Sequence, residues 1–485
     1  MMEKGVEIMN DAAPETAPHP QRWKMLRITS TMSFLASLDT SIVNIALPGM
    51  STTMNEPASS VTWIVTSYLI AICALMLFFG RLGDIKGNTK VYKSGVIIFT
   101  AGSLLCGISI NLPTLVIARI VQAVGAASVM ANNQGIIIQN FHANERGRAI
   151  GFNATCVALG TMLGPPLGGF IISTLSWHFI FLVNVPIGVV IYILCRRMLP
   201  KGVAVNESLD IKGALLFGLG AVLIFCAIGG GENVNFVNPF VISAILVGLV
   251  LMVVFILVER GQKHPMLDLS IFKNSLFTIS VASALMVYAS ISSINIIQPF
   301  YLQKARGLTS FASGLILMTY PLVLAIASPF AGYLSDKIGQ KIPTLVGLCI
   351  STTGYICAAF MTVNSSLVFS GLVYGLLGIG NALFQSPNTS LIMSSAPRNK
   401  VGVAGSINSL ARNVGFIFGV LLSTSILFNA MSARYGRHVN DYIQGRPDLF
   451  VYGMRITYLV IAGVCFAGAL LTAFRQFSLG KRTSF

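Results

Sequence analysis

The sequence predicts an all-α polytopic membrane protein with two six-helix bundles and two additional helices inserted between them. Hydrophobic residues make up 54% of the 485-residue chain and charged residues only 10%, which leaves too little polar surface for a water-soluble fold. Apolar runs of about 20 residues, each long enough to cross a membrane, recur along the chain. A short turn motif also occurs twice, once in each half of the sequence.

The apolar runs predict about fourteen transmembrane helices. We expect them at 25–48, 61–80, 92–110, 113–135, 147–173, 178–198, 211–229, 238–258, 274–302, 312–334, 342–362, 366–393, 402–428 and 453–474. An even number of spans places both chain termini on the same side of the membrane.

Basic residues gather in alternate loops, which predicts the orientation. Arg81, Lys86 and Lys90 follow the second span, and Arg196 and Arg197 end the sixth. By the positive-inside rule these loops and both termini are cytoplasmic, in a plasma (inner) membrane. The formal charge of +16 comes from such small clusters rather than from one basic face, so we expect no nucleic-acid partner.

The repeated turn motif reads G-x-L-x-D-x-x-G and follows the second and the tenth predicted span. Its two copies contain Gly80, Arg81, Asp84, Gly87 and the following Lys90, and Gly332, Asp336 and Gly339. The glycines form tight turns, or the aspartates act as conformational locks by capping helix N-termini and pairing with basic residues; both interpretations can hold together.

Eight helices separate the two copies, as two six-helix halves with an inserted pair require. We therefore expect a cytoplasmic tail at 1–24, an N-terminal bundle at 25–200, two additional helices with linkers at 201–265, a C-terminal bundle at 266–475 and a second tail at 476–485. Duplicated halves of this kind are typical of transporters, in which rocking of one half against the other alternately exposes a central site.

Three charged side chains lie deep within the predicted spans: Asp39, Arg119 and Arg412. A charge at the centre of a membrane helix costs roughly 2.5–3.5 kcal/mol, so each indicates a functional site. With a rise of about 1.5 Å per residue, Asp39 and Arg119 lie about 13 Å and about 10 Å from the outer ends of their spans. This matched depth predicts an ion pair that acts as a proton switch, or that only locks two helices together.

Arg412 has no acidic residue at its depth, so it meets backbone carbonyls, water or an anionic group of a substrate. Other polar side chains in the spans are candidates for the lining of a central cavity, although a helix–helix hydrogen bond is the more common role for any single one of them. The candidates for substrate contact are Asn44, Tyr68, Gln122, Gln298, Gln385 and Arg412.

A cluster of glycines and prolines in the fifth span predicts a kinked and closely packed helix. Its members are Gly160, Gly164, Pro165, Gly168 and Gly169, with Pro166 beside Pro165. Glycines allow helices to approach closely, and prolines remove backbone hydrogen bonds and bend a helix. We expect this segment at a moving interface, with ordinary helix packing as the alternative.

No catalytic or cofactor site is apparent. There is no phosphate-binding GxxxxGK[ST] loop, the five histidines do not cluster, and the eight cysteines lie in apolar runs without a CxxC pair. We therefore expect that the protein is neither an enzyme nor an ATP-driven pump. We expect it to bind no metal or cofactor, to function as a monomer and to be driven by an ion gradient. A non-transporting sensor on the same scaffold would not need a buried titratable carboxylate.

These segments together resemble the major facilitator superfamily, in particular its fourteen-helix drug:proton antiporter branch. Leu38 to Pro48 resembles the first-helix signature of that branch, Gly80 to Lys90 its loop motif, Arg119 to Gly125 its fourth-helix motif and Gly160 to Gly169 its antiporter motif. Trp177 to Gly188 and Arg412 to Gly415 are also similar to patterns of the branch. The resemblance implies a major-facilitator fold, Asp39 as the proton-linked carboxylate and Arg119 as a functional arginine.

The resemblance implies an exporter of small amphipathic molecules or drugs, including antibiotics, driven by protons. Two departures from the family pattern limit this expectation. The first is in the loop motif, where Ile85 and Asn88 stand at positions that usually have basic residues. The later spans also lack the extra carboxylates found in exporters of multivalent cations. A transporter of a dedicated metabolite, peptide or lipid-like substrate is therefore the alternative.

Overall fold

The structure is a computed structural model that describes residues 20–200, 202, 209–229, 238–262, 266–397 and 401–479, without the side chains of 143–144, 401–402 and 476–479. Most of the predicted terminal tails and parts of the 201–265 linkers lie outside these residues. The helices are α1 (Arg22–Met54), α2 (Ala58–Val61), α3 (Trp63–Lys86), α4 (Asn88–Gly107), α5 (Leu112–Asn140), α6 (Ala143–Thr174), α7 (Phe179–Leu182), α8 (Asn184–Met198), α9 (Ile211–Gly229), α10 (Pro239–Gly261), η2 (Leu269–Lys273), α11 (Ser275–Phe300), η3 (Tyr301–Ala305), α12 (Ser310–Leu317), α13 (Thr319–Ile338), α14 (Lys341–Ala359), α15 (Leu367–Ser394), α16 (Val401–Tyr435) and α17 (Pro447–Leu479).

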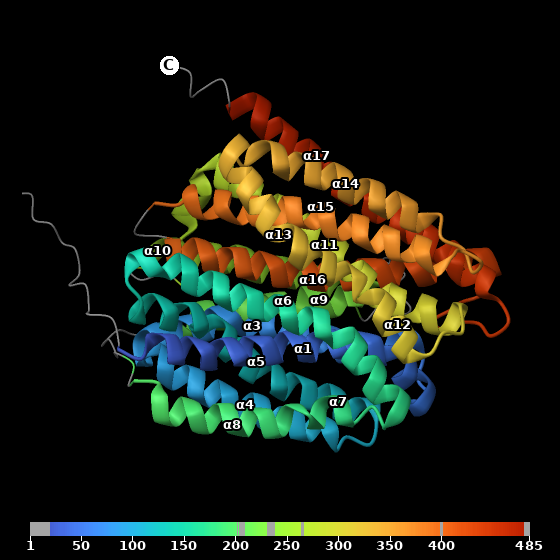
Figure 1. Cartoon of the computed structure of the whole chain (residues 1–485), viewed down its shortest axis with the longest axis horizontal. Coiled ribbons are helices and arrows are strands. Elements are labelled where there is room, and N and C mark those ends of the chain that lie inside the picture. The colour runs from blue at the N-terminus through green and yellow to red at the C-terminus, as the bar shows by residue number, and fades with distance from the viewer. Residues whose placement is uncertain are drawn as a thin grey trace, which may run out of the picture.

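The predicted all-α membrane fold is confirmed. Within the described residues, twelve helical segments are long and apolar enough to cross a membrane, some of them joining two consecutive helices such as α7 and α8. Helices α1 and α4, which are not among these twelve, run alongside them (Figure 1), so the helix count is close to the predicted fourteen. Large apolar side chains such as Phe240 and Phe330 point outward, as a lipid-facing surface requires.

The two halves repeat the same helix pairings. In the first half α1 packs on α6, α4 on α5 and α3 on α5, and in the second half α11 packs on α16, α14 on α15 and α13 on α15. The contacts between the halves follow the same repeat. Helix α6 packs on the α12–α13 segment, and its counterpart α16 packs on α3, the counterpart of that segment. Figure 1 shows the N-terminal half below and the C-terminal half above, with α6 and α16 near the middle.

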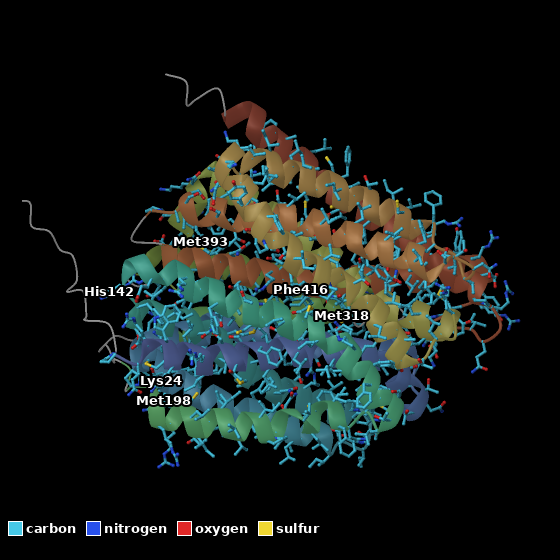
Figure 2. All side chains as sticks on the ribbon, viewed as in Figure 1. Lys24, His142, Met198, Met318, Met393 and Phe416 are labelled. Atoms are coloured by element: carbon cyan, nitrogen blue, oxygen red, sulfur yellow. The ribbon has the colours of Figure 1, made fainter. Side chains whose placement is uncertain are left out.

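The pair α9–α10 lies between the halves in sequence and touches both in space. These two helices pack on each other, and α9 also packs against α3 and α16. The domain boundaries drawn from the sequence stay a prediction. We call the end of the bundle where α1 begins the proximal end, where Lys24, His142, Met198 and Met393 lie (Figure 2), and the opposite end the distal end.

The last glycine of each turn motif ends its helix with a positive φ, 92° at Gly87 and 83° at Gly339. An L side chain in such a region costs about 1–3 kcal/mol. Gly339→Ala is therefore expected to lower the free energy of unfolding by that amount, measured by thermal unfolding in detergent micelles. Gly371→Ala in α15 is the control, because Gly371 is helical and has open space around it; this substitution should be neutral or slightly stabilising.

Candidate functional site

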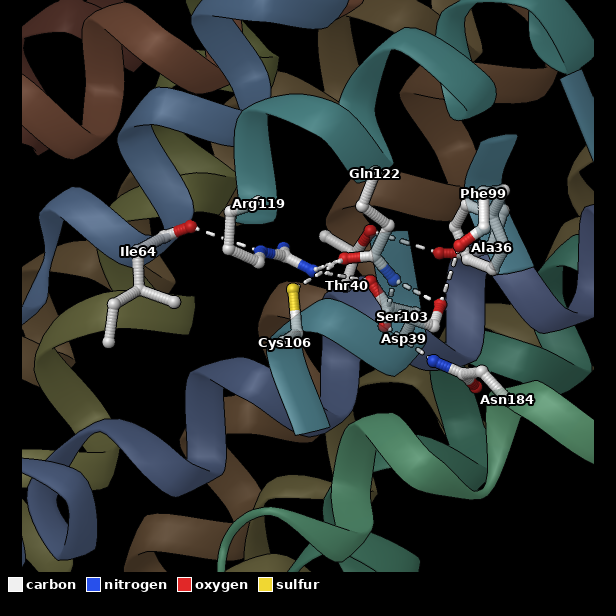
Figure 3. Close-up of polar contacts among 10 residues, drawn as sticks. All are labelled: Ala36, Asp39, Thr40, Ile64, Phe99, Ser103, Cys106, Arg119, Gln122 and Asn184. Atoms are coloured by element: carbon white, nitrogen blue, oxygen red, sulfur yellow. Dashed lines mark hydrogen bonds and ion pairs between the residues drawn. The ribbon is translucent and has the colours of Figure 1, made fainter. Parts of the chain in front are cut away.

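The centre of the N-terminal half contains a buried polar cluster around the Asp39 carboxylate, which we call the carboxylate node (Figure 3). Arg119 Nη1 donates to Asp39 Oδ2 at 2.7 Å. Gln122 Nε2 and Asn184 Nδ2 donate to Asp39 Oδ1 at 3.0 Å and 2.7 Å. All four side chains have 0% exposure to solvent. The structure thus joins the two charges that helix depth predicted to meet.

Arg119 is held from several directions. Its Nε donates to the Ile64 carbonyl at 3.2 Å, and its Nη1 also donates to Gln122 Oε1 at 2.6 Å. The Tyr68 ring lies 4.0 Å from the guanidinium carbon, which gives a cation–π contact in a site without bulk water. Tyr68 and Gln122, predicted as cavity residues, therefore belong to the carboxylate node.

The members of the carboxylate node come from several helices. Asp39 comes from α1 and Asn184 is the first residue of α8. Arg119 and Gln122 are three residues apart on α5, so both face the same neighbours. Ser103 on α4 accepts from Gln122 Nε2 at 2.8 Å and in turn donates to the Phe99 carbonyl at 2.8 Å. The sequence analysis assigned no role to Ser103 or Asn184, because apolar helices contain many single uncharged polar residues and nothing in the sequence distinguishes these two.

A buried ion pair is weak evidence for stability, because desolvation of the two charges offsets their attraction. Removing one partner is a different matter, since the other charge then stays buried without compensation. The carboxylate node is therefore a place where a change of one charge has a large effect. A proton on Asp39 makes such a change without any substitution.

The glycines of the predicted antiporter motif press α6 against α1. A methyl group on Gly160 would lie 2.4 Å from the Phe34 carbonyl oxygen, and one on Gly164 would lie 2.2 Å from Ser41 Oγ. Gly168 faces Ile45 in the same way, at 2.6 Å. Contacts this short leave no room for a side chain, so these glycines set the distance between the two helices.

Proline in α6 creates a specific bond across this interface. Pro165 has no N–H, so the carbonyl of Thr161, four residues earlier, loses its helical partner. Ser41 Oγ of α1 donates to that carbonyl at 2.9 Å. The proline thus frees an acceptor that α1 uses two residues beyond Asp39, and helix packing and the carboxylate node are linked on α1.

The same motif also faces the other half. A methyl group on Gly169 would lie 2.4 Å from the Ser310 carbonyl oxygen at the start of α12, and one on Gly314 would lie 2.2 Å from the Pro165 carbonyl oxygen. The predicted glycine-proline segment therefore lies both within the N-terminal half and between the halves.

Further contacts join the halves at the distal end. Gln303 Nε2 donates to the Ile45 carbonyl at 2.9 Å, and Lys304 Nζ bonds to Thr52 Oγ1. The loop after α16 reaches α2, where the Ala58 N–H donates to Asp441 Oδ1 at 3.2 Å. The bundle is thus held together across both halves at its distal end.

The aspartate of each turn motif lies near the end of its helix. Asp84 lies in the last turn of α3 and Asp336 in the last turn of α13, each followed by the glycine that ends the helix. Asp336 is exposed and makes no hydrogen bond or ion pair with any other described residue. The expected capping contact is therefore absent at the second copy, at least among these residues.

The remaining predicted cavity residues fall into two groups. Gln298 is fully buried, donates from Nε2 to Tyr458 Oη at 2.7 Å and accepts from Tyr374 Oη. Asn44, Gln385 and Arg412 are half-buried, and the Asn44 Oδ1 atom has no hydrogen-bond partner among the described residues. These three remain candidates for substrate contact.

Gln298, Tyr374 and Tyr458 come from α11, α15 and α17, the counterparts of α1, α5 and α8. The C-terminal half thus carries a polar cluster on the same three helices as the carboxylate node, but without a charged member. Among the described residues of these two clusters, the one carboxylate is Asp39 in the N-terminal half. The two halves share the same helix arrangement, so this difference in charge comes from the different side chains at these positions.

Arg412 lies on α16 beside an aromatic pair, and Phe416, one turn further along, lies midway along the bundle (Figure 2). The Phe416 and Tyr288 rings are 5.4 Å apart in an edge-to-face arrangement. Arg412 makes no hydrogen bond or ion pair within the described part of the chain. A half-buried guanidinium without a partner is suited to an acceptor group on a bound molecule.

Two buried charges lie outside the spans drawn from the sequence. Arg475 on α17 has 0% exposure and donates to Ser280 Oγ at 2.8 Å and Thr344 Oγ1 at 3.2 Å. Glu259 on α10 is 3% exposed. Both helices continue past the apolar runs that marked their ends, to Gly261 and Leu479, and these two charges lie just beyond those runs. The expectation that Asp39, Arg119 and Arg412 are the three charges deep within the spans stays a prediction.

This fold and site define a class, a multi-pass membrane transporter of two related helical halves. The sequence profile of the Major Facilitator Superfamily matches residues 29–420 and, in an overlapping second match, 281–477. The chain belongs to this family, as predicted, and its relatives are transporters rather than enzymes.

Curated relatives agree with this assignment. The riboflavin transporter RibZ of Clostridioides difficile is 34% identical over 94% of this chain and 97% of its own length. The multidrug resistance protein Stp of Mycobacterium tuberculosis is 31% identical over 86% of this chain and 77% of its own length. The relatives thus include multidrug transporters, consistent with the predicted branch, and a transporter of a single named compound.

Solved structures show the same fold. A bacterial homologue of the lysosomal transporter Spinster, in an inward-facing and unoccupied conformation, has a TM-score of 0.69 and 15% identity, covering 96% of this chain and 99% of that chain. A peptide transporter in complex with sulfate has a TM-score of 0.69 and 16% identity, covering 96% of this chain and 97% of that chain.

Proposed function

We propose that this protein is a proton-coupled antiporter that exports small amphipathic molecules by alternating access. The observation that carries the proposal is the carboxylate node, in which a fully buried Asp39 meets Arg119 at 2.7 Å. A titratable carboxylate buried where several membrane helices meet is the kind of group that carries the coupled proton in such transporters. The gradient supplies the energy, so no cofactor is needed.

The conformational change follows from the interfaces. In the proposed orientation both termini are cytoplasmic, in the plasma (inner) membrane, and the distal end faces outward. The distal contacts of Gln303 and Lys304 with α1 then close the outer side. Export requires these contacts to open while the proximal side closes, and Asp39 exchanges its proton between the two states.

Transport by the purified protein in liposomes tests this function. With an imposed pH gradient, a panel of amphipathic compounds should be driven against its concentration gradient, and collapse of the pH gradient with an ionophore should stop the flux. A sodium gradient without a pH gradient is the matched control. Transport that ignores the pH gradient would overturn the mechanism, and binding without flux would indicate a sensor.

A dedicated metabolite is the second candidate substrate, favoured by a specific observation. Arg412 is half-buried, unpaired among the described residues and beside the Tyr288–Phe416 aromatic pair. This combination suits a planar molecule that bears a carbonyl, carboxylate or phosphate group. The similarity to RibZ, named as a riboflavin transporter, supports the same class.

Arg412→Gln distinguishes these candidates. For a planar substrate with an acceptor group, loss of the charged donor should weaken apparent affinity by about 10- to 100-fold, as expected for a hydrogen bond to a charged group. For an uncharged aromatic analogue that lacks the acceptor group, the apparent affinity should change less than about threefold. Equal loss for both compounds would show that Arg412 serves the fold instead, and thermal unfolding would reveal this.

A further inference from the structure

Within the described part of the chain, the side chains that bond to the Asp39 carboxylate are all donors. Arg119 faces Oδ2, and Gln122 and Asn184 both face Oδ1. An ionised carboxylate is satisfied by this arrangement, because its oxygens only accept. A protonated carboxyl group must also donate, and none of these three bonds provides an acceptor. Uptake of a proton therefore requires one neighbour to turn.

Gln122 is fixed at both ends of its amide. Its Oε1 accepts from Arg119 Nη1 at 2.6 Å, and its Nε2 donates to Ser103 Oγ at 2.8 Å as well as to Asp39. Cys106 Sγ is a further donor to Oε1, at 3.7 Å. Reversal of this amide would replace favourable contacts with donor–donor and acceptor–acceptor contacts. Gln122 is therefore unsuited to follow the protonation state.

Asn184 is fixed at one end only. Its Nδ2 donates to Asp39 at 2.7 Å, whereas its buried Oδ1 has no hydrogen-bond partner in the described part of the chain. An orphaned oxygen on a side chain of 0% exposure is unfavourable and asks for an explanation. A second state in which Oδ1 has a partner provides one.

We propose that Asn184 is a positioning residue for the proton, and that its side-chain amide turns over when Asp39 is protonated. The proton comes from water on the side to which the node is open, bonds to Asp39 Oδ1 and is later returned to water on the other side. Asn184 Oδ1 then accepts from the new O–H group. The inference rests on the proposed proton coupling.

The other titratable groups around Asp39 do not replace this acceptor. Arg119 on α5 only donates. Tyr68 on α3 turns its ring toward Arg119, and no hydrogen bond joins its hydroxyl to Asp39 among the described residues. Cys106 on α4 donates to Gln122 Oε1. Asn184 is the neighbour that changes from donor to acceptor by a half-turn of its own amide.

Infrared difference spectroscopy of the purified protein tests the proposal without any transport assay. Spectra are recorded across a pH titration, with asparagine labelled by ¹³C at the side-chain carbonyl. The carboxyl band lost in Asp39→Asn is assigned to Asp39. We expect an isotope-sensitive asparagine band to appear together with it, and to vanish in Asn184→Leu, which keeps the branched shape without polar atoms.

Transport provides the second readout. Asn184→Leu should slow pH-gradient-driven transport by about 10- to 100-fold through kcat, because a charged hydrogen-bond partner is lost. Substrate KM should change less than about threefold. Asn184→Ser should recover much of the rate, since a hydroxyl both donates and accepts.

Asn388→Leu is the matched control. Asn388 on α15 is also buried, donates to the Ser280 carbonyl at 3.0 Å and has an unpartnered Oδ1 among the described residues, but lies in the other half. Its substitution should leave the Asp39 band unchanged. The proposal is overturned if Asp39 titrates in the wild-type protein with no asparagine band. Failure of the proposed function appears separately, as absence of the Asp39 band change or of pH-driven flux.

Discussion

Asp39→Asn is expected to abolish pH-gradient-driven transport, by about 100-fold or more, and also to destabilise the protein. The neutral side chain cannot exchange a proton, and it leaves the fully buried Arg119 without its counter-charge. Loss of one partner of a buried pair costs about 3–5 kcal/mol. Flux in liposomes and thermal unfolding in micelles measure the two effects separately.

The double substitution Asp39→Asn with Arg119→Gln separates a proton switch from a structural lock. It removes both charges, so most of the lost stability should return, as for other buried pairs replaced together. Proton-driven transport should not return, because no titratable group remains at this position. Recovery of both stability and proton-driven transport would show that the pair only joins α1 to α5. Arg119→Gln alone should be destabilised like Asp39→Asn.

The pairing of Asp39 with Arg119 was predictable from sequence because helix rise converts residue number into depth. Two charges at the same depth in an apolar bundle have few other partners. Positions of the helices were predictable for the same kind of reason, since lipid requires long apolar segments. The tight turns at Gly87 and Gly339 were predictable because glycine adopts a positive φ without strain.

The rest of the node depends on which helices are neighbours. Asn184 and Ser103 are ordinary polar residues along the chain, and only the contact of α4 and α8 with α1 and α5 makes them partners of this cluster. Arg475 was missed for another reason. Hydropathy ends a span where apolar residues stop, whereas α17 continues to Leu479 and buries the arginine against α11 and α14.

The packing partners of the glycine-proline segment also could not be predicted from the sequence. Its composition predicts close packing but not the partner. Gly164 faces α1 within the same half, whereas Gly169 faces Ser310 across the boundary between halves. Neighbouring glycines of one motif thus have separate mechanical roles, and substitutions at the two positions should have different consequences.

Gly169→Ala is expected to shift the equilibrium of the whole molecule away from the state closed at the distal end. The new methyl group would lie 2.4 Å from a backbone carbonyl of α12, an atom that cannot turn aside. Overpacking of this kind costs about 1–3 kcal/mol, equivalent to a roughly 5- to 150-fold shift in population. The cost disappears when α6 and α12 separate, so only one of the two states is penalised.

Spin labels at Thr53 and Thr309, in a cysteine-free background, report this shift as a longer distance between the distal ends of α1 and α12. Transport should fall by about tenfold, because one state of the cycle becomes rare. Gly164→Ala should lower thermal stability without changing that distance, since its clash with Ser41 lies within one half and persists in both states. Gly151→Ala, in the same helix with open space around it, should change neither property. An unchanged label distance in Gly169→Ala would mean that this seam is a fixed contact and that the two halves separate elsewhere.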